Sequence, residues 1–443
     1  MMSRTSRQVD VVKVVDGAAI AKGTVIVAAL CAGVSFLDGF DILAISYVAP
    51  VLSATWKLPK EAFGPIFAAT YIGAAAGAVF FGWYADRYGR RLGVILPTAI
   101  FGLFAVLTAY AYDFRSLAIL RMLTGVGLGG ALSNAVAMVS ECSPQRARAT
   151  LISIMYTAFP LGGVIGGPIS ANLIAHYGWE AVFILGGVLP LLLTIVLLVW
   201  LNESIRFLVL SKAPAAQIGD VLHRIASSFE SQPSDVYFLP QSRSLSTKPT
   251  REIFSRGFVR TTVLLCVAAF VAQVMVVYIV TWMPLVLASI GIDVTRAILV
   301  SVAFTAGGIF GTIGLARIVD KDKSYRALVI SFFLSALAVA TIGFFASNWY
   351  ALLAIAFLCG MPTIGANIVL YAFSATVYPA PLRSTGVGWV VGCGRVGAIA
   401  GSLLGTLLSV LGFGIASVYG IAAIPAIIGG IAIALAKNKE PSD

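Results

Sequence analysis

The stretch VSFLDGFDILAISYV, residues 34–48, places two carboxylates near the middle of an apolar run that extends from about Thr24 to Ser53. A run of this length crosses a bilayer as a helix, and each acid near a helix centre costs roughly 2.5–3.5 kcal/mol on insertion. Spaced i and i+3, Asp38 and Asp41 share one helix face, which must line water, protein or a ligand path. Because two ionised carboxylates this close repel each other, we interpret the pair as a site where a cation, most simply a proton, binds and leaves. The alternative is that a buried acid only pairs with an arginine.

The composition is that of a polytopic membrane protein. Of the 443 residues, 59% are hydrophobic and 11% are charged, whereas typical soluble domains are roughly 45–50% apolar and about 25% charged. The net charge of +11 does not indicate a nucleic-acid partner, because the Lys and Arg residues lie mostly between the apolar runs. The five cysteines are scattered and the two histidines lie in loops, so we expect no metal, no cofactor and no enzymatic activity.

Twelve apolar runs are long enough to cross a bilayer, six before a polar segment and six after it. The sequence therefore predicts an all-α polytopic membrane protein with twelve transmembrane helices in two pseudo-symmetric six-helix bundles. The expected helices are residues 24–53, 62–84, 92–111, 116–139, 150–174 and 181–201, then 258–289, 295–317, 325–345, 350–377, 385–411 and 415–436. The expected units are a cytoplasmic tail over 1–23, bundles over 24–201 and 258–436, a cytoplasmic linker over 202–257 and a cytoplasmic tail over 437–443.

The distribution of Lys and Arg predicts the orientation in the membrane. With the N-terminus in the cytoplasm, 24 of the 30 basic residues fall in cytoplasmic segments, and the basic residues left outside are Lys57, Lys60, Arg115 and Arg296. We therefore expect both termini in the cytoplasm. Within the linker, the amphipathic segment 215–229 is expected to lie along the membrane surface.

The two halves of the sequence repeat. Asp86 follows the second run and Asp320 follows the eighth, 234 residues later, while Arg148 opens the fifth run and Arg383 the eleventh, 235 residues later. Two anchors with nearly one offset indicate a duplication. Parallel six-helix halves are typical of many secondary transporters, which bind their substrate near the membrane midplane where the halves meet.

The segment GWYADRYGRR, residues 82–91, lies in the turn between the second and third runs. It resembles the loop signature of the major facilitator superfamily at every defining position, whereas the second copy around Asp320 lacks the Gly and the distal Arg pair. Gly residues allow close helix approach and a sharp turn, and Asp86 can cap a neighbouring helix or pair with a cytoplasmic arginine. The alternative is a topological anchor that only keeps positive charge inside. Residues expected to hold a gate closed are Gly82, Asp86, Arg87, Gly89, Arg90 and Arg91.

Charged residues at both ends of the fourth run extend this picture. Arg121 lies several residues inside the run, where it needs a carboxylate or a wet cavity, and either acid of the first run is the obvious partner. The segment ECSPQRAR, residues 141–148, resembles the superfamily's loop between the fourth and fifth helices. We expect Glu141, Arg146 and Asp86 to form one gate network.

Polar and aromatic side chains near the midplane are candidates for a substrate site. Arg395 lies ten residues into its run, where its partner is either an acid in the same cavity or the negative group of a substrate. The acids of the first half thus face a base in the second. For Tyr156 and Phe159, each taken alone, a packing role is at least as frequent as a binding role. The candidates are Tyr156, Phe159, Tyr278, Trp282, Asn367, Tyr371 and Trp389.

The pattern as a whole is similar to the aromatic acid:proton symporter family, whose members import 4-hydroxybenzoate-, benzoate- and gallate-type acids into bacteria. The resemblance covers nearly the whole chain, although Ser133 stands where a proline is expected. It rests on Asp38-Gly-Phe-Asp41, Arg121, the Asp86 loop, Arg383 and Arg395.

The resemblance implies a role for each charged residue. Asp38, Asp41 and Arg121 would couple transport to protons, and Arg395 would bind the substrate carboxylate, with Asp41 also lining that site. Asp320 and Arg383 would take part in gating. We therefore expect a monomeric transporter of the bacterial inner membrane, whose partners are an aromatic carboxylate, protons and the lipid bilayer.

Two other functions stay open. The segment GVIGGP, residues 163–168, overlaps an element associated with drug antiporters, so proton-coupled export of small aromatic compounds is the first alternative. The trailing glycine pair of that element is replaced by Ala171 and Asn172, which weakens this alternative. The second alternative is a membrane sensor that binds the acid without moving it. A sensor favours a structured signalling segment, whereas 202–257 is short and compositionally biased, which weakens this alternative.

Overall fold

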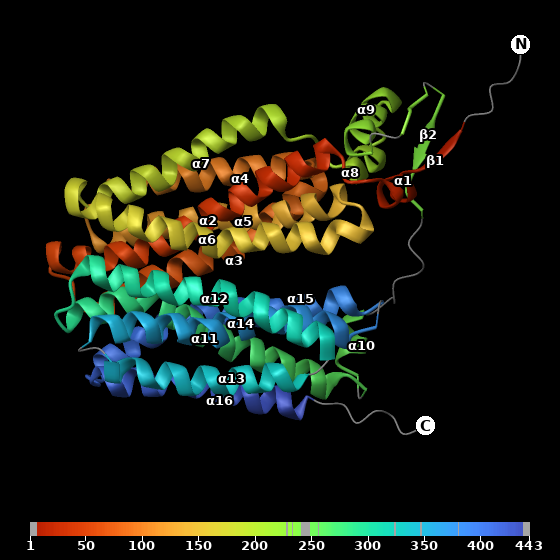
Figure 1. The fold of residues 1–443 in the computed structure, drawn as a ribbon. Helices are drawn as coiled ribbons and strands as arrows, with labels where there is room; N and C mark the ends of the chain where they lie inside the picture. Colours follow the sequence, from red (N-terminus) through yellow and green to blue (C-terminus); the bar gives the residue numbers. More distant parts are fainter. Residues whose placement is uncertain are drawn as a thin grey trace, which may run out of the picture.

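The computed structural model describes residues 7–226, 229–232, 234–240, 249–255, 257–322, 325–345, 348–379 and 381–436, with the backbone alone at 249 and 320–322. Within these ranges, twelve helices are long and apolar enough to cross a membrane (Figure 1), which confirms the predicted fold class. The first six are α2 (Lys22–Thr55), α3 (Phe63–Tyr88), α4 (Arg90–Thr108), α5 (Phe114–Cys142), α6 (Gln145–Tyr177) and α7 (Glu180–Trp200). The second six are α11 (Val259–Ser289), α12 (Val294–Asp322), α13 (Tyr325–Thr341), α14 (Trp349–Val377), α15 (Arg383–Val410) and α16 (Ile415–Leu435).

Local sequence signals explain several helix boundaries. Asp113 and Ser116 form a reciprocal capping box that starts α5. Gly89 separates α3 from α4 with φ +105°, a conformation that favours glycine. Two short 3-10 helices, η1 (Lys60–Ala62) and η2 (Ile342–Phe345), lie before α3 and after α13.

The two halves, α2–α7 and α11–α16, form separate bundles that pack by the same rules (Figure 1). In the first half α2 packs on α6, α3 on α5 and α4 on α7; in the second half α11 packs on α15, α12 on α14 and α13 on α16. Glycines repeat with the packing. A Cβ atom at Gly125 would lie 2.1 Å from the Thr70 carbonyl oxygen, and one at Gly360 would lie 1.8 Å from the Phe304 carbonyl oxygen. Such close backbone approach is typical of small residues between membrane helices.

Contacts between the halves obey the same pseudo-symmetry. Ser46 Oγ in α2 donates to the carbonyl oxygens of Val280 and Thr281 in α11, at 3.1 and 2.8 Å. These partners are 234 and 235 residues apart, which is the repeat offset, so they meet at the axis that relates the halves. Two further contacts between the halves form a symmetry-related pair. Gly64 of α3 meets Ser402 of α15, and Ile298 of α12 meets Gly167 of α6. Ile298 follows Gly64 by 234 residues, and Ser402 follows Gly167 by 235.

A small folded unit covers one end of the first half. We call it the cap unit; it comprises β1 (Gln8–Asp10), α1 (Val11–Gly17), α8 (Ile205–Leu210), α9 (Ala215–Ile225) and β2 (Val236–Phe238). Strands β1 and β2 pair in parallel, with Gln8 opposite Val236. The helices α1, α8 and α9 contact α6, α5 and α2 respectively, so the unit sits on the first half (Figure 1). We call this end of the bundles the cap end and the opposite end the far end.

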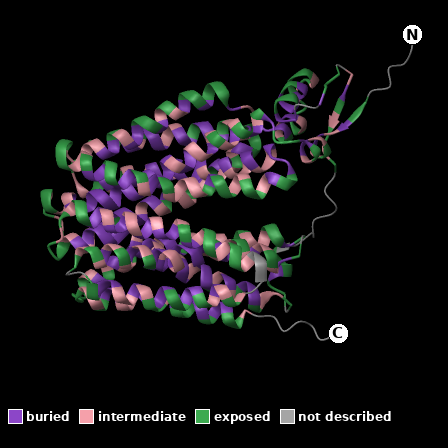
Figure 2. Cartoon of the chain, viewed as in Figure 1, coloured by how far each residue is buried: buried purple, intermediate pink, exposed green. Residues whose placement is uncertain are grey.

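The cap unit differs from what the sequence led us to expect. The apolar face of α9, which includes Ile218, Leu222 and Ile225, is buried in one cluster with Val11 and Val15 of α1. Protein covers this face, in contrast to the membrane-surface placement expected for 215–229. The short helix α10 (Pro249–Ile253) lies instead beside α15 in the second half. Figure 2 shows the resulting distribution, with buried residues inside each bundle and exposed ones along its outer surface.

Candidate functional site

The centre of the first half holds a fully buried ion pair. Arg121 of α5 donates to Asp41 of α2, with Nη2 2.5 Å from Oδ2 and Nη1 3.2 Å from Oδ1. Neither side chain is exposed to solvent, and the guanidinium also lies 5.5 Å from the centroid of the Phe183 ring. This bidentate geometry is the strong form of a charge-assisted hydrogen bond. Of the two acids that the sequence offered to Arg121, the packing of α5 against α2 selects Asp41.

Asp38 lies one helical turn before Asp41 but in a different environment. It is 2% exposed, and its Oδ1 atom has no hydrogen-bond partner within the described residues. The charged groups that act on it electrostatically are Asp41 in the same helix and Arg395 in the other half. The two acids therefore differ: Asp41 is held by an arginine, whereas Asp38 has an Oδ1 atom without a hydrogen-bond partner in the described part of the chain.

Arg395 reaches from the second half to the first. It belongs to α15, and its Nη1 donates to the carbonyl oxygen of Ala74 in α3 at 3.4 Å. It acts electrostatically on Asp38, on Tyr156 of α6 and on Tyr371 of α14. The structure thus brings the acid of the first half, the base of the second half and two tyrosines into one region between the bundles.

The other predicted binding residues divide into two groups. Near Arg395, Asn367 is buried and donates to Gln273, and Tyr156 is 47% exposed on α6. Phe159 lies one turn beyond Tyr156, with its carbonyl oxygen 1.8 Å from where a Cβ atom at Gly39 would stand.

Three predicted aromatic residues lie away from the Arg395 region. Tyr278 and Trp282 are buried, with ring centroids 6.4 Å apart, and Trp282 Nε1 donates to the Ser402 carbonyl oxygen at 2.9 Å. These contacts belong to the closed far end of the interface. Trp389 packs edge-on against Phe254 at 5.1 Å, next to α10 at the cap end.

The predicted gate residues of the first half form a chain of polar contacts at the cap end. Asp86 Oδ1 pairs with Arg90 Nη2 at 2.6 Å, and Arg90 Nε lies 3.4 Å from Glu141 Oε1. Glu141 also accepts a hydrogen bond from the Ser204 hydroxyl. Arg90 thus links Asp86 to Glu141, and a role of these contacts in gating stays a prediction.

Glu203 is a further member of this region that the sequence did not reveal. Its Oε1 accepts hydrogen bonds from the backbone N–H groups of Arg91 and Ser204, at 3.0 and 2.8 Å. Burial nevertheless raises the pKa of the Glu203 carboxyl. Glu203 and Ser204 directly follow the last helix of the first half, where they were counted as the start of a linker.

The remaining gate candidates are placed as follows. Gly89 packs against the Glu203 carboxylate, and Arg91 Nη2 donates to the Leu198 carbonyl oxygen at 2.5 Å. Arg87 lies over the ring of Tyr88, with 5.9 Å between the guanidinium carbon and the ring centroid. Arg383 is exposed at the first turn of α15. The side chain of Asp320 lies outside the described residues.

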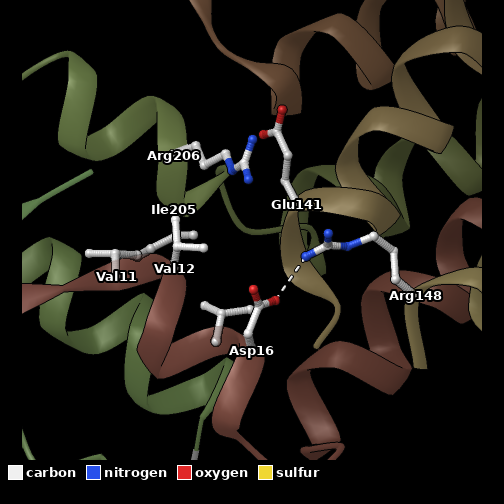
Figure 3. A pocket seen from close by; sticks show the side chains of 8 residues that line it. Val11, Val12, Asp16, Glu141, Arg148, Ile205 and Arg206 are labelled. Carbon is white, nitrogen blue, oxygen red and sulfur yellow. Dashed lines mark hydrogen bonds and ion pairs between the residues drawn. The ribbon is translucent and has the colours of Figure 1, made fainter. Parts of the chain in front are cut away.

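Arg146 departs from the expected network. Its Nη2 atom donates to the Ala18 carbonyl oxygen at 3.0 Å, which ties α6 to the end of α1. The neighbouring Arg148 pairs with Asp16 at 3.0 Å. Figure 3 shows Asp16 and Arg148 beside a small pocket, where Arg206 points toward Glu141. The arginines that open α6 therefore hold the cap unit, and Arg90 takes the place expected for Arg146.

The faces of α3 and α15 meet at the far end and separate toward the cap end. At the far end Thr406 Oγ1 in α15 lies 2.0 Å from where a Cβ atom at Gly64 would stand. Gly82 and Gly388 lie on the same two faces, because each is 18 residues, or five helical turns, from its far-end counterpart. A Cβ atom at either position would meet nothing within 4 Å. Space for a side chain therefore opens between the halves at the cap end.

Within the described ranges, no group of three or more His, Cys, Asp or Glu side chains is arranged to hold a metal ion. The chemistry available to the site is thus proton exchange at carboxylates, ion pairing at arginines and contact with aromatic rings. This set suits an organic anion and protons.

Comparison with known proteins shows the family and the fold of the chain. The sequence profile of the Major Facilitator Superfamily matches residues 31–324 and 265–443. The chain is 34% identical to the gallate transporter of Pseudomonas putida, over 96% of this chain and 94% of that protein. It is 33% identical to the 4-hydroxybenzoate transporter PcaK of the same organism, over 91% of this chain and 90% of that protein. A crystal structure of a D-xylose-proton symporter superposes with a TM-score of 0.73 at 16% identity, covering 94% of this chain and 98% of that one.

Proposed function

The chain belongs to the Major Facilitator Superfamily, and we propose that it imports an aromatic carboxylic acid of the hydroxybenzoate or benzoate class together with protons. Members of this superfamily are transporters, so the expectation that the protein is not an enzyme is confirmed. The names of the two relatives support an aromatic acid as the substrate. The observation that carries the proposal is the buried Asp38, whose Oδ1 atom has no hydrogen-bond partner among the residues described and on which Arg395 of the opposite half acts electrostatically.

Energetics require a coupled cation for such a substrate. An anion that enters a cell with a negative interior works against about 2.3 kcal/mol per charge for each 100 mV. One proton carried with each carboxylate removes this cost, and a pH gradient then drives accumulation. We assign the proton to Asp38, because a buried carboxylate without a partner is stable only when neutral or when a cation approaches it.

Asp41 and Arg121 have a different role in this proposal. Their ion pair is sealed and bidentate, so it fixes the position of α2 against α5. Arg395 binds the substrate carboxylate. When Asp38 is protonated, Arg395 loses its nearby counter-charge and is free to hold the substrate; when the substrate leaves, Asp38 can release its proton toward the same opening. Tyr156 and Tyr371 flank this exchange and offer ring faces to the aromatic group.

The separation of α3 and α15 supports alternating access. We place the cap end in the cytoplasm of a bacterial cell, because that orientation leaves the Lys and Arg excess on the inside of the inner membrane. The conformation described here then opens inward. In the opposite state the Gly82 and Gly388 faces approach each other, and the Asp86, Arg90 and Glu141 chain helps to hold that end closed. Both termini are then cytoplasmic, and a single chain suffices for the cycle.

The test is uptake by the purified protein in proteoliposomes with an imposed inward proton gradient. Wild-type protein is expected to accumulate an aromatic acid, and a protonophore is expected to abolish the accumulation. Asp38→Asn should still catalyse exchange of labelled for unlabelled acid but lose accumulation. Accumulation that ignores the protonophore would refute proton symport. Net export under the same gradient would establish the antiporter, and binding without any movement would establish a sensor.

A further inference from the structure

A buried amide pair lies in the second half near Arg395. Asn367 Nδ2 in α14 donates to Gln273 Oε1 in α11 at 2.6 Å. Asn367 is 7% exposed, and its Oδ1 atom has no hydrogen-bond partner within the described residues. A buried carbonyl oxygen without a hydrogen-bond donor destabilises the folded state, and a bound ligand that donates a hydrogen bond to it would offset that free-energy cost.

The backbone of α15 connects this amide pair to Arg395. A Cβ atom at Gly394 would lie 2.2 Å from the Tyr371 hydroxyl and 3.3 Å from Gln273 Cγ. The hydroxyl of Tyr371 and the side chain of Gln273 therefore lie against the residue that directly precedes Arg395. Arg395 also acts electrostatically on Tyr371, so one hydroxyl, two amides and one guanidinium from α11, α14 and α15 lie in a single region.

We propose that Asn367, positioned by Gln273, binds a hydroxyl group on the substrate ring, so that the transporter selects hydroxylated aromatic acids over the unsubstituted acid. The inference rests on the proposed function, in which Arg395 holds the carboxylate. A phenolic hydroxyl donates to the unpaired Oδ1 of Asn367. The pairing survives if both amides are turned over, because a hydroxyl group also accepts a hydrogen bond from the nitrogen that is then left free.

Selectivity between hydroxylated and unsubstituted acids follows from the free-energy cost of leaving the buried Asn367 amide without a hydrogen-bond partner. An unsubstituted ring, or one with a methyl group in place of the hydroxyl, leaves Asn367 desolvated without a partner. Sites built to hydrogen-bond a substrate hydroxyl reject analogues that lack it far more strongly than apolar pockets distinguish two sizes. Gln273 acts as a positioning residue, because it holds the Asn367 amide in one orientation.

The experiment compares substrates within each protein in proteoliposomes. The panel contains benzoate, 3-hydroxybenzoate, 4-hydroxybenzoate and 4-methylbenzoate, and the measurement is kcat/KM for uptake. Wild-type protein is expected to favour one hydroxylated acid over benzoate and over the methyl analogue by at least about 10-fold. This ratio is expected to fall toward one in Asn367→Leu and to fall less in Gln273→Leu.

Thr363→Val is the matched control. Thr363 is buried one turn before Asn367 in α14, and its hydroxyl already donates to the Cys359 carbonyl oxygen of the same helix. Removing that hydroxyl should leave the substrate ratio at its wild-type value. A change in the ratio for Thr363→Val as large as that for Asn367→Leu would refute a specific role for Asn367.

Other outcomes separate this inference from the proposed function. If wild-type protein moves every acid in the panel with equal efficiency, import stands and hydroxyl recognition is refuted. Equal losses for all four acids in Asn367→Leu also refute it, because a merely structural residue would lower them together. If the variant does not fold, the wild-type preference between hydroxyl and methyl decides. Absence of uptake for all acids in wild-type protein would overturn the proposed function itself.

Discussion

The buried ion pair of Asp41 and Arg121 makes a quantitative prediction about stability. At separations of 2.5 and 3.2 Å, two unit charges attract by about 5–7 kcal/mol at an effective dielectric constant near 20. Asp41→Asn removes this attraction and leaves a guanidinium that is fully buried and cannot lose its proton. Breaking such a pair from one side costs about 3–5 kcal/mol. Arg121→Gln should cost less, because the Asp41 carboxyl left behind can become neutral by binding a proton.

The assay is thermal unfolding of the purified protein in detergent. With an unfolding entropy of about 2.1 cal/mol/K per residue, 3–5 kcal/mol corresponds to a fall in the midpoint of roughly 3–5 °C for a chain of this length. The double variant Asp41→Asn with Arg121→Gln should recover part of this loss, since neither charge remains. Asp38→Asn is the matched control. The Oδ1 atom of Asp38 has no hydrogen-bond partner within the described residues, so replacing this carboxyl by an amide of the same shape breaks no ion pair and should lower the midpoint less.

The reasoning would be refuted if Asp41→Asn melted within about 1 °C of wild type. It would also be refuted if Asp38→Asn lost as much stability as Asp41→Asn. Either result would mean that the two acids are equivalent in the folded protein. The assignment of the proton to Asp38 would then lose its structural basis.

Four further predictions concern packing, the closing of the cap end, pH and the cap unit. Gly39→Ala places a Cβ atom 1.8 Å from the Phe159 carbonyl oxygen and should destabilise the protein by about 1–3 kcal/mol in thermal unfolding. Gly82→Leu should melt like wild type but slow uptake, because the larger side chain blocks the approach of α3 to α15. Burial raises the pKa of the Glu203 carboxyl above its usual 4.5. The contribution of Glu203 to stability is therefore present below pH 4.5 and is lost as pH rises through the raised pKa. Glu203→Gln should flatten the pH dependence of the melting midpoint above pH 4.5. Asp16→Asn, at a partly exposed ion pair, should cost about 1 kcal/mol or less and lose its effect in high salt, as melting at two ionic strengths would reveal.

The membrane helices could be predicted because one local property decides them. The first run was expected at 24–53 and the helix covers Lys22–Thr55, since the length of an apolar stretch depends on neighbours in sequence alone. The shared face of Asp38 and Asp41 was equally local. Which acid meets Arg121 was not, because it depends on the packing of α5 against α2, and both acids are offered by the same helix face.

The cap unit could not be predicted for the opposite reason. Strands β1 and β2 have three residues each and lie more than 200 positions apart, so no pattern within either segment reveals the pairing. Glu203 was missed because it stands two residues beyond the last apolar residue, where composition indicates only the end of a helix. The partner of Arg146 was missed for a similar reason, because Ala18 belongs to the segment 1–23, which was expected only as a cytoplasmic tail.

The pairing of β1 with β2 sets an order of events during synthesis. The strand at Gln8–Asp10 leaves the ribosome first, yet its partner at Val236–Phe238 emerges only after all six helices of the first half have been made. The β1 segment therefore stays unpaired with β2 while those helices insert. When β2 arrives, the cap unit can close on a finished first bundle before most of the second bundle exists, so each half can be matured in turn.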